Sequence, residues 1–102
     1  QLSQLNSNLF ANKTRLINLD LSNNKLKKIK SDLFRDLISL KILNLELNLI
    51  DEIEPKSFDN LINLEILKLD SNRFLDLDEN IFINLSNLIV LYLNQNFLNS
   101  LE

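Results

Sequence analysis

The chain has 102 residues, of which 45% are hydrophobic and 25% charged, and its formal net charge is −3, a composition that suits one globular domain. It contains no His, Cys, Met, Trp or Gly and a single Pro. Because the commonest general base, the thiol nucleophile and the softer metal ligands are all missing, the composition argues against an enzyme and against a bound metal or cofactor. No apolar run reaches about 18 residues, so no transmembrane helix is predicted.

In chain order, a partial unit (1–15) precedes the stretch LINLDLSNNKLKKI at 16–29. Nearly the same spelling returns at 40, 64 and 88, which defines units 16–39, 40–63 and 64–87 and a truncated unit 88–102. The repeat period is 24 residues, and a repeat of this length is typical of a solenoid or a propeller. We predict one repeat domain over 1–102, which we expect to be a fragment of a longer array because both ends read like interior units.

The first predicted strand surrounds Leu19 and Leu21, which alternate with polar neighbours at the period of a β-strand. The same alternation returns around 43–45, 67–69 and 91–93. No single unit could bury its own apolar face, so the short strands must align as a parallel sheet stabilised by neighbouring units. The predicted core also includes Leu2, Leu5, Ile29, Ile53, Leu77 and Leu101.

Two further columns follow from residues that recur once in each unit. An Asn where the chain leaves the strand could bond the loop backbone of its own unit and of the next. A recurring Phe could fill the broad side opposite the sheet. We therefore predict a structural Asn ladder of Asn24, Asn48, Asn72 and Asn96, and a Phe spine of Phe10, Phe34, Phe58 and Phe82. Ordinary surface turns are the interpretation for Asn23, Asn60, Asn63 and Asn87.

The combined pattern LxxLxLxxNxLxxIxxxxFxxLxxL, with IEPKSFDNL at 53–61, resembles the leucine-rich repeat family in its 24-residue typical class. Among its members it is similar to Toll and Toll-like receptor ectodomain repeats. The resemblance implies an α/β right-handed solenoid, a horseshoe arc with short parallel β-strands on the concave face and mostly irregular turns on the convex face. The chain departs from the family in lacking cysteine-rich caps and in carrying Lys30, Glu54, Asp78 and Glu102 where members normally have Pro.

The outward residues of the concave strands are the candidate partner-binding surface. An apolar strip rimmed by charge is typical of an interface, although β-branched residues are also favoured simply because they suit strands. The candidate residues are Ile42, Asn44, Glu46, Ile66, Lys68, Asp70, Val90, Tyr92 and Asn94.

Charge is unevenly distributed along the chain. Lys25, Lys27, Lys28 and Lys30 form a basic cluster, which could attract nucleic acid. The repeat register favours another interpretation, in which Lys27, Lys28 and Lys30 lie beside Asp51, Glu52 and Glu54 as ion pairs between units. We therefore expect no nucleic-acid partner.

Two short motifs remain. DLDEN at 76–80 resembles the start of a calcium loop but lacks the Gly and the final Glu that such a loop needs. Sequons at Asn12 and Asn84 fall at the same place in the repeat and are candidate N-glycosylation sites, although about two sequons are expected by chance from this composition.

Solenoids of this resemblance bind partners and do no chemistry. The first hypothesis is therefore a recognition module in an extracellular Toll-like innate immune or cell-surface receptor, a glycoprotein whose partner is a protein or microbial ligand or a second copy of itself. Its contact with a membrane would come only through other parts of the parent chain. The alternative is an intracellular leucine-rich-repeat scaffold or adaptor in the cytoplasm. A third hypothesis is a structural spacer without a ligand.

Overall fold

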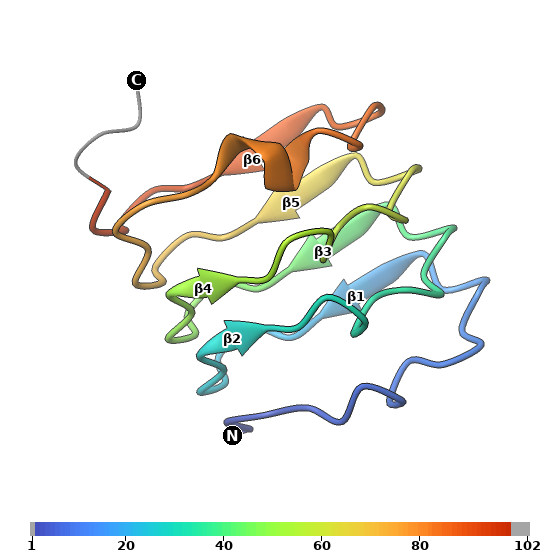
Figure 1. The fold of residues 1–102 in the computed structure, drawn as a ribbon, viewed down its shortest axis with the longest axis horizontal. Helices are drawn as coiled ribbons and strands as arrows, with labels where there is room; N and C mark the ends of the chain where they lie inside the picture. The colour runs from blue at the N-terminus through green and yellow to red at the C-terminus, as the bar shows by residue number, and fades with distance from the viewer. Residues whose placement is uncertain (1, 99–102) are drawn as a thin grey trace.

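Each repeat contributes one short strand to a parallel sheet in the structure, a computed structural model that describes residues 2–98. The strands lie side by side in chain order and pair in a single register, so that Asn18, Ile42, Ile66 and Val90 form one row (Figure 1). The predicted solenoid of short parallel strands is confirmed. The four strands are β1 (Asn18–Asp20), β3 (Ile42–Asn44), β5 (Ile66–Lys68) and β6 (Val90–Tyr92).

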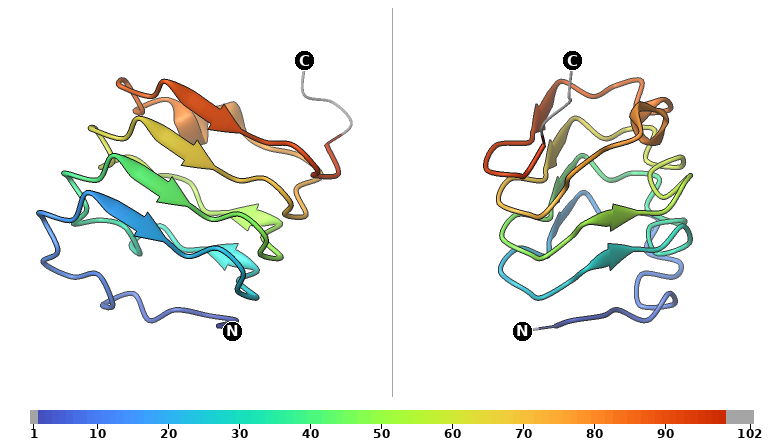
Figure 2. Two further views of the ribbon diagram at one scale, coloured as in Figure 1. Left: turned by 180° about the vertical axis from the view of Figure 1, so that it is seen from behind. Right: turned by 60° about the vertical axis from the view of Figure 1, so that its left-hand side comes forward.

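A second, two-stranded parallel sheet lies on the other side of the core from the first (Figure 2). It pairs β2 (Lys28–Ile29) with β4 (Glu52–Ile53) and was not predicted. Both strands carry a β-branched Ile, which favours extended backbone, whereas the equivalent residues Leu5 and Leu77 lie outside any strand. Lys28 also faces Glu52 across the pair, and opposite charges on neighbouring strands stabilise the pairing.

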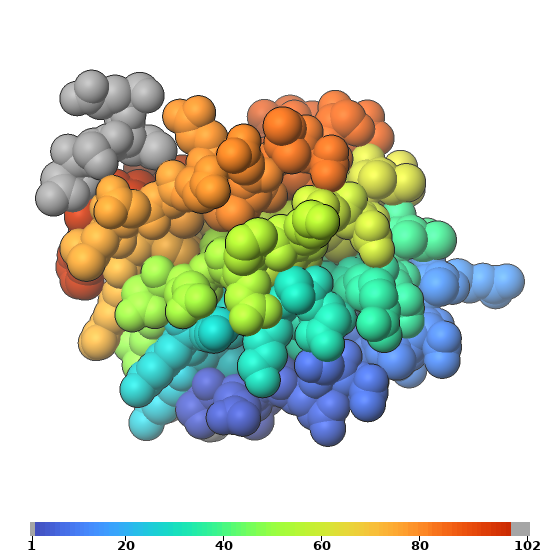
Figure 3. Space-filling model, viewed as in Figure 1, coloured from blue at the N-terminus to red at the C-terminus, as the bar shows by residue number. Residues whose placement is uncertain are grey.

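The remaining side of each unit is built from turns. Among residues 2–98 the only regular helix is η1 (Glu79–Phe82), a short 3-10 helix. The Asp78 carboxylate caps its N-terminus by accepting from the backbone amide of Asn80 at 2.9 Å. In the space-filling view the units stack as successive bands from the N-terminal end of the molecule upward (Figure 3).

The core runs along the axis of the stack. Leu43 and Leu67 in the two inner strands, and Leu45 and Leu69 directly after them, have no exposed surface. The matching leucines in and after β1 and β6 are half-buried because they have a neighbouring strand on one side only. The Phe side chains stack from Phe10 to Phe82 with ring centroids 6.1, 6.4 and 6.4 Å apart. Leu101 of the predicted core lies outside the described residues.

The Asn side chains at the strand ends form hydrogen bonds within and between units. Asn72 Nδ2 donates to the carbonyls of Leu69 (3.0 Å) and Asp70 (3.3 Å) in its own unit and to that of Leu45 (3.0 Å) in the preceding one. Its Oδ1 accepts from the Ile50 amide at 3.1 Å. The same pattern surrounds Asn48, so the carbonyl of Leu45 accepts from two asparagines. These bonds tie consecutive units together at the end of each strand.

Positive φ angles recur at one position just before each ladder Asn. Each lies in the left-handed region, which costs an ordinary residue about 1–2 kcal/mol and suits Asn better than most. The bulkiest occupant is Leu47, whose side chain is 51% exposed. The φ angles are 60° at Asn23, 57° at Leu47, 59° at Ser71 and 58° at Gln95. Sequence reasoning missed this constraint, because only Asn23 shows the residue preference that signals it.

Three asparagines interpreted as ordinary turn residues do more than close turns. Asn60, Asn63 and Asn87 each donate from Nδ2 to a carbonyl of the preceding unit, at 3.0, 2.8 and 2.8 Å. All three are exposed, so each bond competes with water and contributes less than a buried ladder bond. The prediction that these are surface residues in turns is confirmed, and their side chains in addition link one unit to the one before it.

Candidate functional site

The outer surface of the four-stranded sheet, here called the sheet face, brings the predicted partner-binding residues together. Ile42, Ile66 and Val90 lie in one row across β3, β5 and β6, and all three are half-buried. The next outward row contains Asn44, Lys68 and Tyr92 in the same register. The sheet therefore presents a continuous apolar row beside a polar one, because parallel strands in a fixed register stack equivalent residues.

A lysine and a tyrosine meet at one end of this face. Lys68 Nζ lies 5.9 Å from the centroid of the Tyr92 ring, a geometry that contributes about 0.5–1 kcal/mol at an exposed site. Tyr92 is 39% exposed, and tyrosine is common among residues that dominate binding energy. The pair holds a flat aromatic side chain and a cation at adjacent positions on the surface.

Acidic and amide side chains lie along the edge of the same face. Asp70 Oδ1 accepts from the backbone amide of Asn94 at 2.6 Å, and Asn44 Oδ1 accepts from the backbone amide of Glu46 at 3.0 Å. These bonds fix the backbone at the strand ends and hold the side chains in place. The Glu46 carboxylate completes the edge, half-buried.

Asp20 is the β1 member of the row that contains Asn44, Lys68 and Tyr92. Its Oδ1 accepts from both the hydroxyl and the backbone amide of Ser22, at 2.6 and 2.9 Å. The Ser22 hydroxyl, then its amide, and more weakly the charge of Lys68 hold the pKa of the Asp20 carboxyl below its ordinary value. Asp20 is therefore ionised at neutral pH, so the sheet face carries negative charge near Lys68.

The basic cluster forms fewer ion pairs than the register predicted. Lys28 Nζ lies 3.5 Å from Glu52 and 3.2 Å from Glu54. The predicted Lys27–Asp51 and Lys30–Glu54 pairs are absent among the described residues. The expectation was wrong for these two pairs because Glu54 turns toward Lys28 and accepts from the Ser31 amide at 2.7 Å through its other oxygen. The Ser31 amide, followed by Lys28, lowers the pKa of the Glu54 carboxyl.

The two sequon asparagines, Asn12 and Asn84, are both exposed. They occupy equivalent corners of units that lie at opposite ends of the stack. The backbone of Asn12 is held in place by its amide, which donates to Asp36 Oδ2 at 2.9 Å. Glycosylation at these two residues stays a prediction.

The part of the chain that the structure describes has no cluster of three or more His, Cys, Asp or Glu side chains arranged to hold a metal ion. Within the same residues, no helix has both the length and the apolarity to cross a membrane.

Comparison with known proteins supplies the family. A model described as leucine rich repeat matches residues 14–74 and 62–102. The chain is 30% identical to a protein in the crystal structure of a TLR13–ssRNA13 complex, with a TM-score of 0.92 over 99% of this chain and 14% of that one. It is 29% identical to a protein in the glycosylated Toll–Spatzle complex of Drosophila, with a TM-score of 0.88 over 93% of this chain and 14% of that one.

A search by sequence against characterised proteins gives no match. The chain spans about a seventh of the length of each of the two structural relatives. The first of these structures is a complex with ssRNA and the second a complex of Toll with Spatzle, so the expectation that nucleic acid is not a partner has no support from them.

Proposed function

Because the chain belongs to the leucine-rich repeat family and is a non-enzymatic interaction module, we propose that its sheet face recognises a protein ligand as part of the ectodomain of a Toll-like cell-surface receptor. The observation that carries the proposal is the row of Ile42, Ile66 and Val90 beside the Lys68–Tyr92 pair on one continuous surface. An apolar centre with a charged edge is the usual anatomy of a protein interface.

A protein fits this surface better than a nucleic acid does. Asp20 lies in the same row of the sheet face as Lys68, and Glu46 and Asp70 follow the strands at the edge of that face, so the phosphates of a nucleic acid would meet three carboxylates on a face with one ammonium group. A protein ligand can offer basic side chains to those carboxylates and an apolar residue to the Ile and Val row.

The role of the sheet face is tested by replacing Ile66 and Tyr92 with Lys, together, in the native protein that carries this chain. Recognition through the sheet face predicts loss of ligand-dependent signalling or complex formation. Leu75→Lys with Ile83→Lys, at exposed apolar residues outside the four-stranded sheet, makes the same change in charge; it is the matched control and should leave both unchanged. A structural spacer predicts that neither variant changes any interaction, and that result would overturn the proposal.

The proposed location outside the cell has a separate test. Candidate glycan sites at Asn12 and Asn84 are both exposed, and the similarity to Toll and Toll-like receptor structures supports the same location. The intact mass of the native protein is measured before and after glycosidase treatment. A mass loss mapped to Asn12 or Asn84 supports a cell-surface location, and an unchanged mass in a protein recovered from the cytoplasm favours the intracellular scaffold.

A further inference from the structure

Strand β2 is paired with β4 along one edge, and along its other edge residues 2–6 lie beside it without strand pairing. On the paired side, the Asp51 amide donates to the Lys27 carbonyl at 3.1 Å and the Glu54 amide to the Ile29 carbonyl at 2.9 Å. On the other side residues 2–6 begin in register, since the Lys25 amide donates to the Leu2 carbonyl at 2.6 Å. Beyond that point no equivalent bond joins Lys27 or Lys30 to the described part of the preceding segment.

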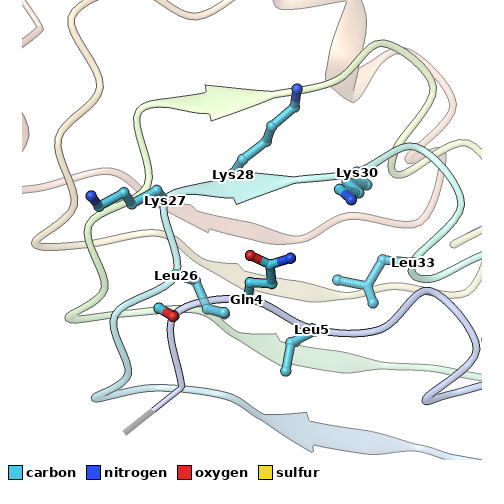
Figure 4. A pocket seen from close by; sticks show the side chains of 8 residues that line it. Gln4, Leu5, Leu26, Lys27, Lys28, Lys30 and Leu33 are labelled. Atoms are coloured by element: carbon cyan, nitrogen blue, oxygen red, sulfur yellow. The ribbon is translucent and has the colours of Figure 1, made fainter.

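A cavity of about 250 Å³ separates β2 from residues 3–5. Leu5, Leu26 and Leu33 form its apolar floor, and lysines stand along the rim (Figure 4). Lys28 points from the rim toward β4 and is paired with Glu52 and Glu54.

The other two rim lysines, Lys27 and Lys30, are exposed and have no ion pair with a described carboxylate. The cavity thus combines an apolar floor, the ammonium groups of Lys27 and Lys30 without an ion pair, and an edge of β2 that has no hydrogen bond to residues 2–6 beyond Lys25. Each of these features suits a different part of one extended ligand.

The strand β4 shows what pairs with β2. The segment IDEIE at 50–54 lies parallel to β2, with the Glu52 carboxylate on Lys28 and Ile53 packed against the core. An extended strand places alternate side chains on opposite faces, so within residues 52–54 both glutamates reach Lys28 while Ile53 points inward. A second strand with this alternation would find the same partners at the open edge.

We propose that the open edge of β2 binds an extended segment of a partner protein in which acidic and apolar residues alternate. The segment adds a parallel strand to the sheet, and its main chain bonds the Lys28 amide and carbonyl and the Lys30 amide, since the carbonyls of Ile29 and Lys30 already accept from Glu54 and Leu33. Its apolar side chains cover Leu5, Leu26 and Leu33, and its carboxylates pair with Lys27 and Lys30. This surface is separate from the sheet face and does not depend on the function proposed for it.

A peptide fits this edge better than a nucleic acid does. Phosphates would also attract the lysines, but they make no use of an apolar floor or of free strand amides. In the next unit Glu52 and Glu54 contact Lys28 on the rim of the cavity, so a polyanion following the surface would soon meet like charge. A short acidic strand confined to the β2 edge avoids those carboxylates.

The test uses a labelled peptide with the sequence of residues 49–54, LIDEIE, capped at both ends, and the 102-residue chain in fluorescence anisotropy. Saturable binding is expected below roughly 1 mM, weaker at about 300 mM salt than at about 50 mM. Lys27→Glu with Lys30→Glu should weaken binding about tenfold. The matched control, Lys13→Glu with Lys41→Glu, changes net charge equally at a distance from the cavity and should bind as the unmodified chain does.

A second peptide separates strand pairing from simple charge attraction. N-methylation of its second Ile removes the amide that would donate to β2, so binding should be lost while the charge is unchanged. Circular dichroism confirms that both charge variants retain the fold. Three results would each overturn the proposal: no binding by the unmodified peptide, equal binding by the N-methylated one, or binding only of a thymidine oligonucleotide at these lysines.

Discussion

Replacing Asn72 with Ala should destabilise the chain more than the same replacement of any asparagine outside the Asn ladder. Asn72 is 4% exposed and makes four hydrogen bonds. Its removal leaves the Ile50 amide without its partner in the interior, which costs about 1–3 kcal/mol. The carbonyls of Leu45 and Leu69 keep a second donor, from Asn48 and Asn96, so each lost bond there costs about 0.5–1 kcal/mol.

The expected loss for Asn72→Ala is therefore about 2–5 kcal/mol, a large part of the 5–15 kcal/mol that stabilises a domain of this size. Asn24 at the end of the ladder bonds exposed groups, among them the Leu2 amide at 2.8 Å. Because water can replace those bonds, Asn24→Ala should cost only about 1 kcal/mol.

The assay is urea unfolding followed by far-UV circular dichroism, with the slope against denaturant checked for each variant. Asn63→Ala is the matched control, since it removes one exposed bond between units. Equal losses of unfolding free energy for Asn72→Ala and Asn63→Ala would refute the reasoning that the buried ladder holds the units together.

Further predictions concern backbone strain, pH and the open ends. Leu47→Asn should raise the unfolding free energy by about 1 kcal/mol, because it relieves a left-handed backbone (φ 57°), and Asn23→Leu should lower it similarly in the same urea assay. Since the pKa of Glu54 is held below its ordinary value of 4.5, its contribution is present above that value and is lost as pH falls through the lowered pKa. Acid titration of stability should therefore be shallower in Glu54→Gln, and an unchanged profile would contradict the contact with the Ser31 amide. The isolated chain exposes Leu2 and Phe97 near its ends, by 49% and 58%, and should unfold below about 65 °C in calorimetry.

The strand positions could be predicted because a 24-residue period fixes which residues neighbour one another. Once Leu43, Leu67 and Leu91 are aligned, a parallel register is the only way to bury all three. The Asn column at the strand ends followed from the same alignment, since a buried amide in every unit needs backbone partners in every unit.

The second sheet and the ion pairs could not be predicted in the same way. Lys27, Lys28 and Lys30 all have an acidic residue in the equivalent position of the next unit, yet only Lys28 forms a pair. Long exposed side chains choose among several partners of similar energy, so register alone does not decide the contact. The left-handed position at Leu47 was also hidden, because its residue type argues against that conformation.

The central claim is that the sheet face, and not the opposite side of the stack, meets the ligand. The most direct measurement places a photoreactive phenylalanine analogue at Tyr92, or at Ile83 on the other side, in the native protein on its producing cells. The account predicts a ligand adduct from residue 92 and none from residue 83. An adduct from residue 83 alone would contradict it.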